Sequence, residues 1–283
     1  MTLKRKISRT VRDVASVLAL LIISRLIGVY WPKTLQAHFS ATLAHMVWGS
    51  LVYAALVLIG LYFLNKYVFH DRFRLVGFPP AIRSQYFAWG AWLVGMFYGG
   101  TLATGARLVL PASNPQAVAQ MAVSAFDTAL IAPFVEELVF RGVILPRIAK
   151  HHGVRKAILI SSVLFGVLHM MNGRMDALSA VQTGVAITLI GMLLSLICLK
   201  EKSIWASFTV HAMNNLIELV FPMGTSVRHD WPVNLVLTSS RRFVAGGAYG
   251  ADTNGIYMAA AIVMMVWIVS RSKPLQKALG FNV

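Results

Sequence analysis

The chain has 283 residues, of which 57% are hydrophobic and only 13% are charged. Because a soluble domain carries about 25% charged residues, this composition excludes an ordinary soluble enzyme and indicates a membrane protein. The net charge of +16 does not indicate a nucleic-acid partner, because the basic residues form short clusters between apolar runs, as in the cytoplasmic loops of membrane proteins. The expected partner is the lipid bilayer.

Apolar runs of about 18 residues or more predict membrane spans. In chain order we predict an all-α polytopic membrane protein of about eight transmembrane helices, enclosing a polar cavity. The fourth span is long enough to be tilted or broken, and Asp252 with several glycines blurs the start of the eighth. No internal repeat or linker divides the chain, so one membrane domain over 1–283 is expected. The predicted spans are 13–31, 42–65, 87–106, 118–146, 157–173, 177–199, 203–222 and 254–270.

The ends of these spans carry unequal charge. The segments on the side of the N-terminus hold about three times as many Lys and Arg residues as those on the other side, which predicts that both termini lie in the cytoplasm. The first span follows a basic N-terminal segment, but Arg25 interrupts it and no small-residue cleavage site follows, so we read it as an uncleaved span. The short, basic style of the chain is typical of a bacterial plasma-membrane protein.

The fourth span contains ionisable residues, which are costly inside a membrane and usually functional. Glu136 and Glu137 are neighbours and therefore cannot share one helix face. Glu137 and Arg141 are four residues apart and can form an ion pair. Such a pair would leave Glu136 free for proton transfer. The alternative is that both glutamates belong to a structural charge network around Arg141.

Two later spans carry histidines. His169 follows Phe165 by one helical turn in the fifth span, and His211 precedes Asn215 by one turn in the seventh. Counted from the flanking basic residues, Glu136 and both histidines lie roughly 14–20 Å from the cytoplasmic ends of their helices. A lone buried histidine is usually a packing residue, but three spans with polar groups at one level favour a shared site. For the remaining intramembrane polar residues we favour structural roles: Arg25, Asp127, Asn214 and Glu218.

Three motifs, in this order, resemble the CPBP family of intramembrane proteases, which includes the CAAX prenyl endopeptidases and the bacterial Abi proteins. They are Glu136-Glu137-x3-Arg141, Phe165-x3-His169 and His211-x3-Asn215. The resemblance covers roughly residues 120–220, and no motif position departs from the family pattern. It implies an eight-helix fold whose cavity opens to the cytoplasm.

The resemblance also implies roles for these residues. Glu136 is expected to act as general base on a water molecule with His169 as its partner, and His211 with Asn215 to form an oxyanion hole. The residues expected to support this arrangement are Glu137, Arg141 and Phe165. The implied substrate is a peptide or protein that is membrane-associated or lipidated, but the sequence does not identify it.

Two questions stay open at this stage. Glu136, His169 and His211 could instead hold a zinc ion, as the label metalloprotease would require, although we favour a reaction without metal because a ligating glutamate cannot serve as base. The alternative functions are a non-catalytic membrane partner, such as a bacteriocin self-immunity protein, and a proton-coupled transporter. The transporter is less favoured, because the chain lacks repeated halves.

Overall fold

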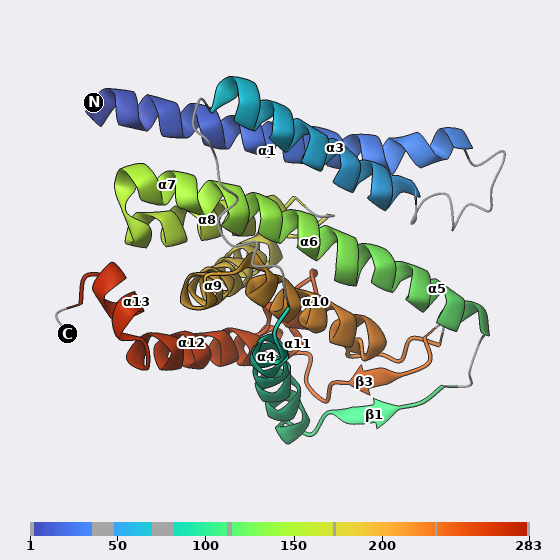
Figure 1. Cartoon of the computed structure of the whole chain (residues 1–283). Helices are drawn as coiled ribbons and strands as arrows, with labels where there is room; N and C mark the ends of the chain where they lie inside the picture. Colours follow the sequence, from blue (N-terminus) through green and yellow to red (C-terminus); the bar gives the residue numbers. More distant parts are fainter. Residues whose placement is uncertain are drawn as a thin grey trace.

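The computed structural model describes residues 3–35, 48–69, 82–111, 115–171, 174–229 and 231–281, and most of them are helical. Helices α1 and α3 run side by side as an outer layer above the segment from α5 to α8, with α9, α10, α12 and α4 below it (Figure 1). The helices are α1 (Leu3–Leu35), α3 (Gly49–Phe63), α4 (Ser84–Ala103), α5 (Pro115–Ala125), α6 (Ala132–Glu137), α7 (Leu145–His152), α8 (Val154–His169), α9 (Ala177–Glu201), α10 (Ile204–Val220), α11 (Arg242–Ala245), α12 (Gly255–Ser270) and α13 (Lys273–Ala278).

The predicted spans coincide with helical segments, apart from 42–47 and 172–173, which lie outside the described residues. Within the described ranges, two helices are long and apolar enough to cross a membrane by length and composition, Gly49–Val68 and Ala177–Glu201. A third apolar helix, Gly255–Ser270, is shorter. The helices that carry the motifs contain prolines, glycines and ionisable groups. The count of eight spans therefore stays a prediction.

The fourth predicted span is broken, as its length allowed. Two π-helical segments, Phe126–Ile131 and Leu138–Ile144, flank the short helix α6. Pro133 lies just after the first π-helical segment, and its missing N–H removes one backbone hydrogen bond from this continuous helical run. Single turns of π-helix are rare and often occur at functional sites, because each inserts an extra residue and re-aims the side chains around it. Both glutamates therefore lie on a short rigid turn between two such irregularities.

Polar side chains cap three of the remaining helices. Asp176 accepts the Ser179 N–H at the start of α9, Ser203 accepts the Trp205 N–H at the start of α10, and Asn254 accepts the Tyr257 N–H at the start of α12. The hydrogen bonds from Ser179 to Asp176, together with Arg242, hold the pKa of this carboxyl well below its usual range. These caps fix where the helices begin, and hence the position along each helix axis of the residues that follow.

A small sheet was not anticipated by the all-α prediction. Strands β1 (Arg107–Val109), β3 (Asn234–Val236) and β2 (Met223–Gly224) pair in that order, β1 with β3 antiparallel and β2 with β3 parallel. The strands have two or three residues each, too short for a period-two hydrophobic pattern. The sheet joins the ends of α4 and α10, far from the glutamates in the chain.

Helices α8 and α9 pack tightly at Gly166. A Cβ at this position would lie 2.6 Å from the carbonyl oxygen of Gly184 and closer still to the Thr188 hydroxyl. We therefore expect Gly166→Ala to lower the free energy of unfolding by about 1–3 kcal/mol, as overpacking does. Chemical unfolding of the purified protein measures it. Gly95→Ala is the control, because a Cβ there meets nothing within 4 Å, and it should leave stability unchanged or raise it. Equal effects of both changes would contradict this account of the packing.

Candidate active site

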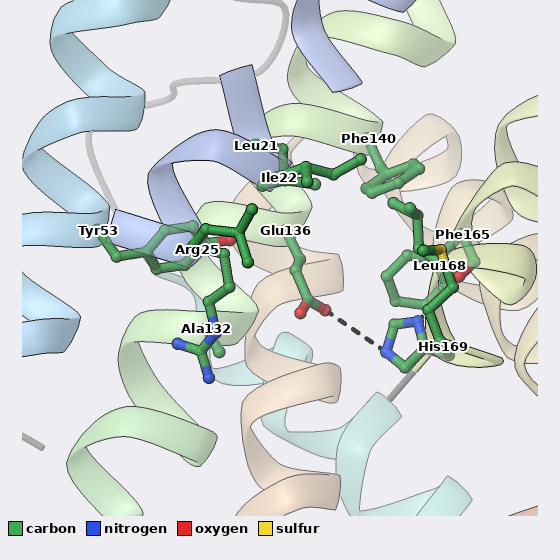
Figure 2. A pocket seen from close by; sticks show the side chains of 12 residues that line it. Leu21, Ile22, Arg25, Tyr53, Ala132, Glu136, Phe140, Phe165, Leu168 and His169 are labelled. Atoms are coloured by element: carbon green, nitrogen blue, oxygen red, sulfur yellow. Dashed lines mark hydrogen bonds and ion pairs between the residues drawn. The ribbon is translucent and has the colours of Figure 1, made fainter. Parts of the chain in front are cut away.

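Three of the residues singled out by the motifs, Glu136, Phe165 and His169, line a cavity of about 370 Å³. Glu136 reaches it from α6, His169 from the end of α8, and His211 approaches the same carboxylate from α10. Figure 2 shows Glu136 pointing toward His169 across this space. The Glu136 Oε2 atom lies 4.0 Å from His169 Nε2 and 3.8 Å from His211 Nε2. Three helices therefore bring one carboxylate and two imidazoles together.

The second glutamate faces away from this cavity. Glu137 is fully buried, and its Oε1 accepts a 2.7 Å hydrogen bond from Arg141 Nη1. Arg141 also donates to the Gly191 carbonyl at 3.0 Å, which anchors it to α9. The predicted pairing of Glu137 with Arg141 is confirmed, and Glu136 makes no ion pair with Arg141. Glu136 keeps a 22% exposed side chain.

Hydrogen bonds fix the orientation of both histidine rings. His169 Nδ1 lies 2.8 Å from the carbonyl oxygen of Phe165, which can only accept, so Nδ1 carries the hydrogen. His211 Nδ1 lies 3.1 Å from Glu137 Oε1, a carboxylate already paired with Arg141. In the neutral rings both Nε2 atoms therefore present a lone pair toward Glu136. A water molecule can donate hydrogen bonds to these converging acceptors.

Phe165 joins the ion pair to the histidines. Its ring lies 4.7 Å from the guanidinium carbon of Arg141 and 4.4 Å from the ring of His169, measured to ring centroids. An arginine over an aromatic face is attracted by the ring quadrupole. Phe165 is itself buried. It therefore contacts both Arg141 and the His169 ring.

Asn215 lies one turn after His211, and its side chain contacts a different partner. Its Nδ2 donates a 2.8 Å hydrogen bond to the Thr128 carbonyl in the first π-helical segment. An amide nitrogen carries two hydrogens, so one remains for a substrate oxygen. Asn215 does not line the cavity described above. Its expected role in an oxyanion hole therefore stays a prediction.

The wall of the cavity opposite His169 comes from residues outside the motifs. Leu21, Ile22 and Arg25 of α1 and Tyr53 of α3 line it (Figure 2). None of the three motifs places a site residue on α1 or α3. The one feature of the sequence that could have indicated a part for α1 is Arg25, a charged residue inside a predicted span. Contacts between segments so distant in the chain leave no local pattern in the sequence.

The polar residues for which structural roles were favoured have partners. The Nη atoms of Arg25 lie 3.4 and 3.5 Å from the two carboxylate oxygens of Asp127, and the Ser50 hydroxyl donates to Asp127 at 2.6 Å. Asn214 donates to Glu218 at 3.1 Å. The first pair ties α1 and α3 to the segment that leads into α6, which is consistent with the structural role.

Residues 118–217 match the model of a protein family described as type II CAAX prenyl endopeptidase, Rce1-like. These residues form an Rce1-like domain. The resemblance of the three motifs to the CPBP family is confirmed, and every proposed site residue, from Glu136 to Asn215, lies inside the match. No curated protein and no solved structure matches the chain. At the level of the family, the Rce1-like domain is that of a membrane protease.

Proposed function

We propose that this protein is an intramembrane endopeptidase that hydrolyses peptide bonds with a water molecule activated by Glu136. The approach of Glu136 Oε2 to the Nε2 atoms of His169 and His211, from three helices, carries the proposal. Its Rce1-like domain supports the reaction class. The carboxylate is exposed to a cavity, and among the described residues these two histidines are its contacts within 4.0 Å, while Arg25 lines the same cavity at a longer distance. A general base needs such access to the reacting water.

The proposed reaction begins with water bound between Glu136 Oε2 and His169 Nε2. Glu136 takes a proton from this water as its oxygen attacks the carbonyl carbon of the peptide bond. Negative charge develops on the carbonyl oxygen and is stabilised by His211 Nε2–H and the free Asn215 N–H. The C–N bond then breaks, and Glu136 returns the proton to the leaving amine nitrogen.

The role of His211 places a demand on its protonation. Because its Nδ1 already serves Glu137, His211 can donate from Nε2 only when both ring nitrogens carry hydrogen. The Glu137 carboxylate, 3.1 Å away, accepts the Nδ1 hydrogen and so turns Nε2 toward Glu136. Arg141 in turn keeps Glu137 in place. The buried pair behind the site thus orients the proposed oxyanion donor.

The same three donors are those that a zinc ion would use. Ligands bound about 2.0–2.2 Å from a tetrahedral zinc lie about 3.4 Å apart, whereas Oε2 lies 3.8 and 4.0 Å from the two Nε2 atoms here. The set is therefore wider than a zinc site and better suited to water. A reaction without metal is proposed on this geometry.

The proposed substrate is a peptide in a membrane-associated or lipidated protein. Apolar side chains make up much of the cavity wall, among them Leu21, Phe140 and Leu168. Such walls accept hydrophobic side chains or hydrocarbon, while Arg25, Glu136 and His169 bring polar groups to the same space (Figure 2). The proposed location is a bacterial plasma membrane with both termini in the cytoplasm.

Cleavage of quenched fluorescent peptides, plain and prenylated, by the detergent-purified protein tests this function. We expect His169→Ala to lower kcat/KM by at least about a hundredfold, because it removes the partner of the base. His229→Ala, which changes an exposed histidine outside the cavity, should match the wild type. A chelator should leave the rate unchanged. A rate lost to chelator and restored by zinc would contradict the metal-free reaction, and equal rates in both variants would contradict the site.

A further inference from the structure

A second hollow lies between α1 and the turn joining α7 to α8. It has a volume of about 410 Å³ and is lined by apolar side chains of both sides, including Val14 and Leu18 of α1 and Leu164 of α8. Ile7, Val11 and Ile160 on its rim are 47%, 61% and 42% exposed. The catalytic residues do not line it. We call this hollow the α1–α8 groove.

Polar contacts hold the groove open at one edge. Asp13 on α1 forms a buried ion pair with Arg147 on α7. Thr10 gives its hydroxyl hydrogen to the Lys6 carbonyl, so it accepts from His152 Nε2 at 3.2 Å. These contacts fix α1 against α7 beside the groove. The groove is therefore built into the helix arrangement.

The edge of the groove near the N-terminus is strongly basic. Lys156 and His152 line it, and α1 begins with further cations at its side. Asp13 is the only acidic residue in 3–35 and 145–169, and it already pairs with Arg12 and Arg147. Lys156 is exposed and has no ion pair with any residue that the structure describes. The first turns of α1 add Lys4, Arg5, Lys6 and Arg9 to the charge at this end of the molecule, with Arg5 and Arg9 on the side of α1 away from Ile7.

We propose that the α1–α8 groove binds an anionic phospholipid, with an acyl chain along the apolar walls and the phosphate at Lys156. An apolar groove that ends in uncompensated cations complements a molecule with a hydrocarbon chain and a negative headgroup, and basic pockets between transmembrane helices bind such headgroups. A second copy of the chain is disfavoured, because its basic edge would meet the same charges. The proposal rests on the membrane location and not on catalysis.

The site borders the catalytic cavity. The helices that form the groove continue into that cavity, α1 through Leu21 and Ile22 and α8 through Leu168. A lipid in the groove would therefore lie along the same seam between α1 and α8 as the proposed substrate. Its chain would support α1 at the point where this helix forms the cavity wall.

Native mass spectrometry of the detergent-purified protein tests the proposal with phosphatidylglycerol and phosphatidylcholine of identical chains. Wild type should bind phosphatidylglycerol preferentially, and Lys156→Gln should lower that preference by about fivefold, the effect of one cation near an anionic headgroup. Lys273→Gln, an exposed lysine outside the groove, should keep it. Ile160→Trp should fill the groove and reduce binding of either lipid, whereas Val163→Trp, similarly exposed on α8 but outside the groove, should not.

Several outcomes would overturn the proposal. They are equal binding of both lipids, an unchanged preference in Lys156→Gln, a thermal stabilisation by inorganic phosphate as large as that by phosphatidylglycerol, and a lipid-free dimer that Ile160→Trp dissociates. Glu136→Gln should bind lipid as the wild type does. Lipid binding can therefore succeed or fail independently of the proposed peptidase activity.

Discussion

Glu136→Gln is expected to lower kcat for peptide cleavage by about a thousandfold, since general bases contribute roughly a hundredfold to ten-thousandfold. Glutamine has the shape of glutamate but cannot accept the proton from water. The carboxylate is 22% exposed and has no hydrogen-bond partner that its replacement would break among the described residues, so the fold should be preserved. Steady-state cleavage of a fluorescent peptide gives the rate, and the thermal unfolding midpoint reports the fold.

The matched control is Glu201→Gln. Glu201 lies at the end of α9, where it accepts hydrogen bonds from Gln85 and Trp89, and does not line the catalytic cavity. This variant should cleave at the wild-type rate. A Glu136→Gln protein that retained cleavage would remove Glu136 from the chemistry. If it lost cleavage and yet protected cells from a bacteriocin as the wild type did, the self-immunity function would not depend on catalysis.

Arg141→Met is expected to lower the free energy of unfolding by about 3–5 kcal/mol, because it leaves a carboxylate buried without its cation. Glu137 and Arg141 have side chains exposed by 0% and 1%, so water cannot replace the lost partner. Arg141 also bonds the Gly191 carbonyl, and that bond would be lost as well. Unfolding by denaturant in a constant detergent concentration measures the change.

The double variant Glu137→Gln/Arg141→Met separates these contributions. If the unpaired charge causes the loss, the double variant should be more stable than Arg141→Met alone, and a double-mutant cycle gives the coupling energy. Arg25→Met is the control, because the Arg25–Asp127 pair is longer and Arg25 is 46% exposed, so its loss should cost at most about 1 kcal/mol. An equal decrease in the free energy of unfolding in Arg25→Met and Arg141→Met would contradict the claim that burial makes the loss of the Arg141 cation costly.

The sequence predicted the geometry of the candidate site well for a physical reason. Charges inside apolar helices are so costly that each one is informative, and helical spacing then decides which can pair. The Glu137–Arg141 pair and the meeting of Glu136 with the two histidines were predicted in this way, and both are confirmed as geometry. Their catalytic roles stay predictions.

Other features depend on contacts that a single chain does not encode locally. The spacing of apolar and polar residues over 126–144 does not distinguish π-helix from α-helix, because both kinds of helix accept the same residue types. The cavity wall from α1 and α3 depends on how those helices pack against α6 and α8, and the small sheet joins Arg107 to Val236 across more than a hundred residues. Such arrangements follow from packing over the whole chain.

Peptide cleavage in water labelled with oxygen-18, followed by mass spectrometry of the products, tests the central claim most directly. The proposed attack by water predicts two fragments from the wild type, with one labelled oxygen in the newly formed carboxylate, and no fragments from Glu136→Gln in the same time. Labelled fragments formed by Glu136→Gln at the wild-type rate would contradict the account, because hydrolysis would then proceed without the residue on which the site is built.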